Sequence, residues 1–235
     1  PVFNSIAKTF DNLYNCQTML DYYDPPTNPY LDIVYYDDDI LVLNKQPGLL
    51  TVPGKGEHLS DCLEKRARKN FPQALIVHRL DMDTSGLIVM GLNKYSHRHI
   101  SLQFQNRNVD KTYVARVFGR IMEESGLIDL PLICDWPNRP KQMVDHENGK
   151  PSQTKWTVIN RDVDETRLKL TPLTGRSHQL RVHLKELGYP ILGDRFYAHE
   201  AALHMSPRLC LHSENLTIMH PVRKEKMTFE CPSSF

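Results

Sequence analysis

The stretch ALIVHRLDMDTSGLIVM, residues 74–90, contains two short apolar runs separated by a polar loop. The runs, residues 75–77 and 87–90, are typical of buried strands. The loop between them places Asp81 where two strands can present a carboxylate at the edge of a cleft. Asp81 is therefore a candidate functional residue. Because Asp, Thr, Ser and Gly also favour turns, a purely structural loop is the simplest alternative.

The same loop permits a metal-dependent interpretation. Asp81 and Asp83 follow an apolar run in the pattern Asp-x-Asp-x-Ser, which resembles the signature of haloacid-dehalogenase phosphotransferases. That chemistry needs Mg²⁺ and further carboxylates downstream. Ala198 stands where a second acidic motif beginning at Asp194 would need an Asp, and residues 78–79 interrupt the strand before Asp81. The sequence therefore disfavours this interpretation.

Strand and helix patterns continue on both sides of the loop. Alternating and short apolar runs predict further strands over residues 32–36, 40–45, 111–118, 153–160 and 167–170. Apolar residues at helical spacing predict helices over residues 60–69, 95–106 and 177–187, with Gly188 as the residue after the last helix. Strand pairs interrupted by helices indicate an α+β protein with a mixed sheet.

A second segment, LTGRSHQLR at residues 173–181, joins a turn to a predicted helix. Gly175 allows the tight turn, and Arg176 falls at the helix start. A cation at this end opposes the helix dipole, so Arg176 is favourable there only if it holds a carboxylate or a phosphate. An arginine solvated at a helix end is an equally simple interpretation.

A third segment, KTYVA at residues 111–115, reads as a strand. Alternation places Tyr113 on the face opposite Thr112 and Val114. If that face lines a cleft, Tyr113 can stack on a base. Otherwise it is an ordinary core residue.

Together, the three segments resemble a known enzyme family. Residues 78–87, 111–115 and 173–181 are similar to the active-site motifs of the RluA family of pseudouridine synthases, in the same order and at similar separation. The similarity covers residues 28–235. The segment DLPLICDWPNRPKQ, residues 129–142, resembles the branch of that family that modifies both rRNA and tRNA. The implied fold is a mixed, mostly antiparallel sheet flanked by helices and loops, with a central RNA-binding cleft.

The resemblance also implies roles for individual residues. Asp81 is expected to be the essential carboxylate, Arg176 its guanidinium partner, and Tyr113 the ring that stacks on the extruded uracil and helps to remove the C5 proton. The expected RNA- and uridine-binding residues are Arg79, which fills the space left by the flipped base, Leu180, which packs beneath the pocket, His78, Thr84 and Arg181. A structural role is favoured for His78, and Asp83 is interpreted as an acceptor that stabilises the loop.

The implied reaction breaks the N1–C1′ bond, turns the uracil and joins C1′ to C5. No group leaves the molecule, so neither a metal nor an organic cofactor is expected. The expected substrates are a hairpin of large-subunit (23S) rRNA and the anticodon stem-loop of some tRNAs, which can be recognised by shape, stacking and phosphate contacts. An RNA-binding module without catalytic activity is the rival interpretation.

Charge and composition are compatible with an RNA partner. Residues 1–44 carry a net charge of −6 and residues 45–235 a net charge of +7. A basic body can bind a polyanion, although on charge alone a solvated, mildly basic surface is the favoured interpretation. Five scattered cysteines without a Cys-x-x-Cys pair suit a reducing cytoplasm. The expectations are therefore a cytoplasmic monomer with no obligate protein partner and no membrane span.

The N-terminal residues are expected to lie outside the catalytic domain. Residues 29–235 are assigned to that domain, without the S4-type RNA-binding module of related branches, and residues 1–28 to an extension and linker. Val2, Ile6, Phe10 and Leu13 recur at helical spacing. A docking helix, a tail and an added segment upstream of Met19 all remain open, and a tail is favoured.

Overall fold

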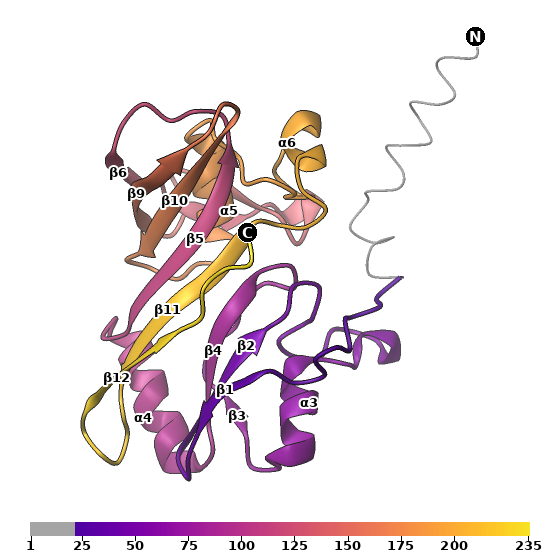
Figure 1. Ribbon diagram of the computed structural model, residues 1–235, viewed down its shortest axis with the longest axis vertical. Helices are drawn as coiled ribbons and strands as arrows, with labels where there is room; N and C mark the ends of the chain where they lie inside the picture. The colour runs from indigo at the N-terminus through magenta and orange to yellow at the C-terminus, as the bar shows by residue number, and fades with distance from the viewer. Residues whose placement is uncertain (1–21) are drawn as a thin grey trace.

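The computed structural model describes residues 22–235, in which ten strands form one large sheet (Figure 1). The main order is β1 (Ile33–Tyr36), β2 (Ile40–Lys45), β4 (Ser85–Gly91), β11 (Leu211–Met219), β5 (Asp110–Phe118), β10 (Glu165–Pro172), β9 (Gln153–Arg161) and β6 (Ser125–Asp129). In addition, β12 (Lys226–Glu230) pairs with β11, and β3 (Leu75–Ile76) pairs with β4. Within this region β4 and β11 run parallel and the other paired strands antiparallel. The predicted α+β class and mixed, mostly antiparallel sheet are confirmed.

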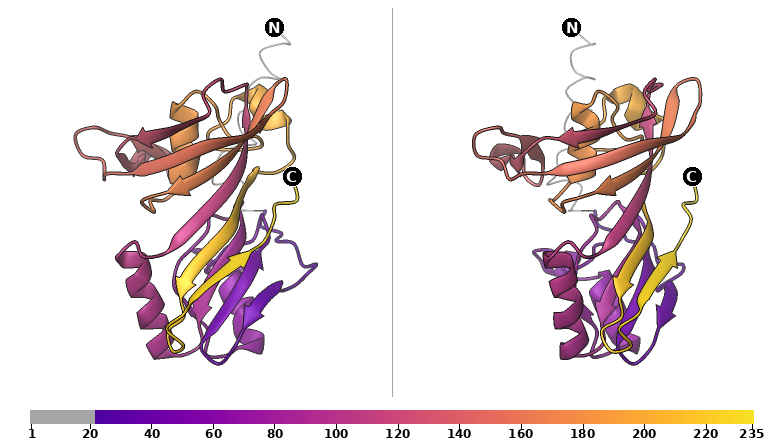
Figure 2. Two further views of the ribbon diagram at one scale, coloured as in Figure 1. Left: turned by 60° about the vertical axis from the view of Figure 1, so that its left-hand side comes forward. Right: turned by 90° about the vertical axis from the view of Figure 1, so that its left-hand side faces the viewer.

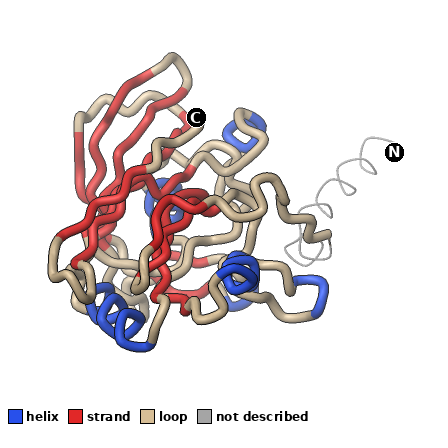
Figure 3. Tube along the Cα trace, turned by 60° about the horizontal axis from the view of Figure 1, so that its bottom comes forward, coloured by secondary structure: helices blue, strands red, loops and turns tan. Residues whose placement is uncertain are grey.

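Helices and long loops lie beside the strands (Figure 3). The helices are α3 (Leu63–Asn70), α4 (Lys94–Gln105), α5 (Gln179–Glu186) and α6 (Glu200–His204), and the 3₁₀ turns are η1 (Glu57–Leu59) and η2 (Trp136–Asn138). A small hairpin of β7 (Leu132–Cys134) and β8 (Gln142–Val144) stands apart from the sheet. Figure 2 shows that β6, β9 and β10 project from one end of β5 toward the same side as α4.

Two predicted helices begin two to three residues later than expected. The helix predicted from residue 60 begins at Leu63, and Ser60 instead ends η1. The helix predicted from residue 177 begins at Gln179, because His178 adopts a left-handed backbone and interrupts the helical path. Gly188 does follow α5 with a positive φ of 92°, as expected for the residue after a helix.

Strands β2 and β4 form a rigid frame because both of their faces are buried. Leu43 and Met90 belong to one hydrophobic cluster, whereas Val42 and Val89 belong to another on the opposite side. Each such side chain stabilises the fold by about 1.5–3 kcal/mol when fully buried. The polar loop that follows β3 is therefore attached to one of the most firmly packed strands of the protein.

Gly86 lets β4 and β11 approach closely at the start of β4. Its φ is 111°, and a Cβ atom there would lie 2.3 Å from the carbonyl oxygen of Ser213. In the strand register Gly86 pairs with Ser213, which in turn pairs with Tyr113 on β5. This register places the loop before β4 and Tyr113 on either side of β11.

Part of the stretch expected to be a linker is anchored to the body of the protein. The Tyr23 hydroxyl donates to the backbone oxygen of Asp61 at 2.8 Å, and Arg66 donates to the backbone oxygen of Pro26 at 2.7 Å. The predicted helical spacing over residues 1–18 lies outside the described residues. From residue 22 onward, no helix combines the length and hydrophobicity needed to cross a bilayer.

Candidate active site

The loop that carries Asp81 is held by hydrogen bonds to its backbone. The Thr51 hydroxyl donates to the carbonyl of Leu80 at 2.7 Å, and the Lys45 ammonium donates to the carbonyl of Met82 at 2.8 Å. Lys45 is fully buried, and this burial lowers its pKa to about 7, partly opposed by Asp83. Because the residues on both sides of Asp81 are fixed, its side chain is presented in one direction.

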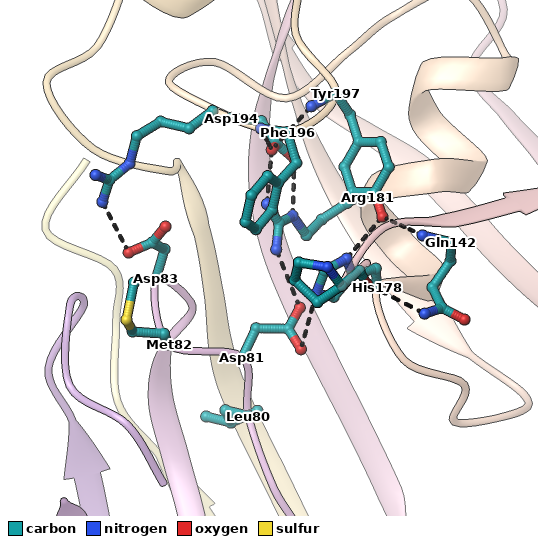
Figure 4. Close-up of polar contacts among 12 residues, drawn as sticks. Leu80, Asp81, Met82, Asp83, Gln142, His178, Arg181, Asp194, Phe196 and Tyr197 are labelled. Atoms are coloured by element: carbon teal, nitrogen blue, oxygen red, sulfur yellow. Dashed lines mark hydrogen bonds and ion pairs between the residues drawn. The ribbon is translucent and has the colours of Figure 1, made fainter. Parts of the chain in front are cut away.

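Arg181, on α5, provides the guanidinium beside Asp81 (Figure 4). Its Nη1 lies 3.5 Å from Oδ2 of Asp81, while Nε and Nη2 form a bidentate pair with Asp194 at 2.8 and 2.7 Å. The side chain of Arg181 is only 2% exposed. Burial opposes its charge, but the Asp194 carboxylate outweighs burial and raises the pKa of Arg181. Arg181 therefore remains a cation beside Asp81.

The expected pairing of Asp81 with Arg176 is wrong. Arg176 is exposed in the turn before α5, and among the described residues it forms no ion pair with Asp81. The helix begins after Arg176, which therefore lies outside its first turn, whereas Arg181 lies within the helix and is buried. Arg176 still lines the cavity beside Asp81, where it can contact RNA.

Tyr113 lies on β5 and lines the same cavity as Asp81. Burial raises the pKa of Tyr113 to about 12, partly opposed by a hydrogen bond with Ser213, while the charge of Asp81 acts in the same direction as burial. The phenol is therefore protonated at neutral pH. Tyr113 also packs against the hydrophobic cluster beneath α5, so the core and cleft interpretations are both partly correct.

A chain of contacts connects Asp81 to the hairpin of β7 and β8 (Figure 4). Nε2 of His178 lies 3.9 Å from Oδ1 of Asp81, and Nδ1 of His178 lies 2.6 Å from the hydroxyl of Tyr197. The backbone N–H of Gln142 donates to the same hydroxyl at 2.8 Å. Phe196 stacks on the His178 ring, with the centroids 5.7 Å apart.

The other predicted binding residues also line the cavity. Arg79 is exposed at its edge, and Leu180 is buried beneath it. His78 accepts a hydrogen bond from Val89 and stacks on a phenylalanine ring of α4, which agrees with a structural role. Thr84 is 2% exposed, and its hydroxyl has no hydrogen-bond partner within residues 22–235. That hydroxyl remains available to a bound molecule.

Asp83 faces away from the guanidinium of Arg181. It is buried and accepts a hydrogen bond from Arg195 at 3.1 Å, as expected for an acceptor that stabilises the loop. The two carboxylates of the loop therefore have different surroundings, and Asp81 is the one that opens onto the large cavity with a cation behind it.

The cavity is large and positively charged. Its volume is about 1780 Å³, and three aspartates, Asp81, Asp83 and Asp110, contribute to its lining. The basic residues of the lining are Lys55, Arg79, Arg107, Lys111, Arg139, Arg176 and Arg181. Seven cations against three anions attract a polyanion such as a phosphodiester backbone.

An exposed aromatic residue lies beside Arg139, which lines the cavity. Trp136, in η2 between β7 and β8, is 64% exposed. The guanidinium of Arg139 lies over its ring, 3.4 Å from the centroid. A ring covered by arginine on one side leaves its other face for a base, and such planar groups are common stacking platforms for single-stranded RNA.

Three residues that complete the site, His178, Asp194 and Tyr197, belong to segments that resemble the family, but sequence reasoning assigned them no role in the site. One signal was available for Asp194. Arg181 lies one position after Leu180 and three before Leu184 on an amphipathic helix, so it faces inward and needs a buried carboxylate. The roles of His178 and Tyr197 depend on a left-handed backbone and a distant loop, for which the sequence offers no comparable signal.

Comparison with known proteins supports these findings. The model of the RNA pseudouridylate synthase family matches residues 39–186. The dual-specificity RNA pseudouridine synthase RluA of Escherichia coli K12 is 55% identical over 214 residues, which cover 91% of this chain and 98% of that protein. The protein of the same name from Pasteurella multocida is 50% identical over the same shares of both chains.

Solved structures agree with the sequence relatives. Human RNA pseudouridylate synthase domain containing 1 superposes with a TM-score of 0.76 at 31% identity, covering 90% of this chain and 87% of that chain. Human RNA pseudouridylate synthase domain containing 4 gives a TM-score of 0.68 at 24% identity, covering 86% of this chain and 88% of that chain, and supports the fold alone. The predicted pseudouridine synthase fold is confirmed.

Proposed function

Because the chain belongs to the RNA pseudouridylate synthase family, we propose that it uses Asp81 to isomerise uridines in stem-loops of both 23S rRNA and tRNA. Membership of this family makes the chain an RNA uridine-to-pseudouridine isomerase and not an inactive RNA-binding module. It also makes the magnesium phosphotransferase interpretation of Asp81 and Asp83 wrong. The dual substrate range is supported by the words "dual-specificity" in the names of relatives that share about half of their residues with this chain.

The geometry around Asp81 supports its assignment as the reacting carboxylate. Arg181, itself held by Asp194, places a permanent positive charge behind Asp81 while the other side of Asp81 opens onto the cavity. The pairing places a cation against one oxygen of Asp81 and leaves the carboxylate accessible from the cavity. Asp81 then acts on the ribose of the target uridine, either by attack on C1′ or by removal of the C2′ proton.

The cavity lining fits a flipped uridine. Tyr113 offers a ring for stacking, Leu180 an apolar floor, and Thr84 a buried hydroxyl without a partner among the described residues. Extrusion of a base costs a few kcal/mol, and this cost is smallest in loops. Exposed Arg79, next to the catalytic loop, is placed to occupy the space left in the RNA.

The protonation state of the Tyr113 phenol limits its possible role in acid–base chemistry. With a pKa of about 12, its phenol is neutral at physiological pH. In this proposal Tyr113 therefore acts first as a stacking surface, and it takes part in removal of the C5 proton only as a hydrogen-bonded phenol that passes the proton on.

Tritium release from RNA labelled at uridine C5 tests the proposal, because joining C1′ to C5 expels the C5 hydrogen. We expect release from an rRNA hairpin and from a tRNA anticodon stem-loop, both in excess chelator. Asp81→Asn should lower the rate by at least about a thousandfold while the protein stays folded. Asp110→Asn, at an exposed position of the same cavity, is the control and should retain most of the activity. Release from only one RNA would contradict the dual range, and an active Asp81→Asn variant would contradict the role of Asp81.

A further inference from the structure

His178 occupies a strained backbone position next to Asp81. It precedes α5 with φ 53° and ψ 15°, a left-handed conformation that is unfavourable for residues other than glycine. Its ring is held by Phe196, which stacks on one side, and by Tyr197, which meets it edge-on at a centroid distance of 5.6 Å. Figure 4 shows Tyr197 and Asp81 on different sides of this ring. Nδ1 is thus directed to Tyr197 and Nε2 to Asp81.

The hydrogen bonds around Tyr197 are compatible with a proton on Nε2 of His178. The backbone N–H of Gln142 can only donate, so the Tyr197 oxygen accepts at this 2.8 Å contact. The single hydroxyl proton of Tyr197 is then free for Nδ1 of His178, 2.6 Å away. In a neutral imidazole one nitrogen accepts and the other carries the proton. When Tyr197 donates to Nδ1, the proton of the neutral ring lies on Nε2, which faces Asp81.

The surrounding charges are compatible with a neutral ring. Burial is the largest influence and lowers the pKa of His178, and Arg181 acts in the same direction. The carboxylates of Asp81, Asp194 and Asp83 oppose this shift without overcoming it. Burial also raises the pKa of Tyr197, so its hydroxyl remains a donor.

We propose that neutral His178 is a positioning residue for Asp81: its Nε2–H is directed at Oδ1, while Arg181 holds Oδ2. The two contacts together fix the rotation of the carboxylate toward the cavity. At 3.9 Å the contact is longer than a hydrogen bond, and the proposal requires it to shorten when a nucleotide fills the cavity. The inference rests on the proposed role of Asp81. It also connects catalysis to RNA contact. Gln142 lines the cavity at the start of β8, and its N–H bonds the Tyr197 hydroxyl that contacts His178.

Two substitutions separate this role from a structural one. His178→Gln can place an amide N–H near the position of Nε2, whereas His178→Asn reaches only the position of Nδ1. We expect His178→Asn to lower kcat by about ten- to a hundredfold with KM changed by less than about threefold, the size expected for one hydrogen bond to a charged group. His178→Gln should remain within about threefold of the wild-type kcat. If His178 only shaped the turn, the order would reverse, because Asn tolerates the left-handed conformation better than Gln.

Nitrogen-15 NMR of histidine-labelled full-length protein provides a test that does not depend on activity. The His178 signals, assigned by their loss in His178→Gln, should show a protonated Nε2 and an unprotonated Nδ1 at neutral pH. Tyr197→Phe should remove the hydrogen bond to Nδ1 and shift its resonance. An imidazolium, or a proton on Nδ1, would overturn the proposal whatever the kinetics of the two variants. Absence of tritium release by the wild-type enzyme would instead refute the proposed function.

Discussion

Arg176 and Arg181 lie five positions apart in the sequence but have different surroundings and different roles. Arg181 is buried and holds Asp194 and Asp81 at once, whereas Arg176 is exposed at the edge of the cavity. Removal of one member of a buried ion pair leaves the other charge without compensation, and this typically costs about 3–5 kcal/mol. An exposed arginine without such a pair contributes little to the free energy of unfolding.

We therefore expect Arg181→Met to lower the free energy of unfolding by about 3–5 kcal/mol and to abolish turnover. Arg176→Met is the matched control and should change the free energy of unfolding by less than about 0.5 kcal/mol. Its effect should appear as weaker RNA binding with kcat largely preserved. Urea denaturation and tritium-release kinetics measure both quantities. The assignment would be reversed if Arg176→Met lost kcat while Arg181→Met kept it.

At the level of secondary structure, the parallel pairing of β4 and β11 brings the loop of Asp81 and the strand of Tyr113 together. It requires a residue without a side chain at position 86, because a Cβ there would overlap the Ser213 backbone. Gly188, after α5, also has a positive φ of 92°, but a Cβ there would meet no atom within 4 Å. A side chain added at position 188 would therefore meet only the conformational cost of a positive φ, whereas one added at position 86 would also meet a steric clash.

Gly188→Ala should lower the free energy of unfolding by about 1 kcal/mol, because only the backbone conformation is strained. Gly86→Ala should lower it by about 3 kcal/mol or more, because overpacking is added to the same strain. Urea denaturation of both variants measures the difference. Equal losses would mean that β4 and β11 can move apart without cost, which would contradict their role as a rigid frame.

The hairpin of β7 and β8 presents Trp136 to solvent beside the cavity. Stacking of one base on an aromatic side chain contributes about 1–3 kcal/mol. Trp136→Ala should therefore raise the KM for a stem-loop RNA by about tenfold with a smaller change in kcat. Leu127→Ala, at an exposed apolar position on β6, is the control and should leave the KM unchanged. Similar KM values for both variants would exclude the stacking platform.

Most of the strands and helices were predictable from the sequence. Burial of one face of an element produces a periodic pattern of apolar residues, and that pattern can be read locally. The strands around Asp81 and the helix that carries Leu180 and Leu184 follow from that pattern. The three sequence motifs also identified segments that line one cavity in the structure. The partner of Asp81 was predicted wrongly because Arg176 was placed at the start of the helix, whereas the helix begins at Gln179 and the buried Arg181 lies within it.

At the scale of the whole molecule, the distribution of charge matters more than its sum. The net charge is +1, and residues 1–44 alone carry −6. The cavity lining nevertheless contains seven basic and three acidic residues, so the positive potential is concentrated where the RNA backbone would pass. Binding of this kind weakens as salt rises, because phosphate contacts release counterions.

Several buried or half-buried histidines make the stability of the whole fold dependent on pH. Burial lowers the pKa of His78, His178, His183 and His212 in the folded protein, with His78 falling to about 3. Unfolded histidines titrate near pH 6.5, so below this pH the unfolded chain binds more protons than the folded one. The stability contributed by the neutral rings is therefore fully present above about pH 6.5 and is lost progressively as the pH falls toward the folded pKa values.

We expect the free energy of unfolding to fall between about pH 6.5 and about pH 5 by up to about 1.4 kcal/mol per pH unit for each fully buried histidine. Urea denaturation at several pH values measures this slope. His78→Gln should reduce the slope by about one proton, since His78 accepts a hydrogen bond from Val89 and stacks on Phe104 only as a neutral ring. His58→Gln is a suitable control, because this exposed histidine should leave the slope unchanged. A slope that His78→Gln does not alter would mean that the His78 ring becomes protonated without loss of the fold.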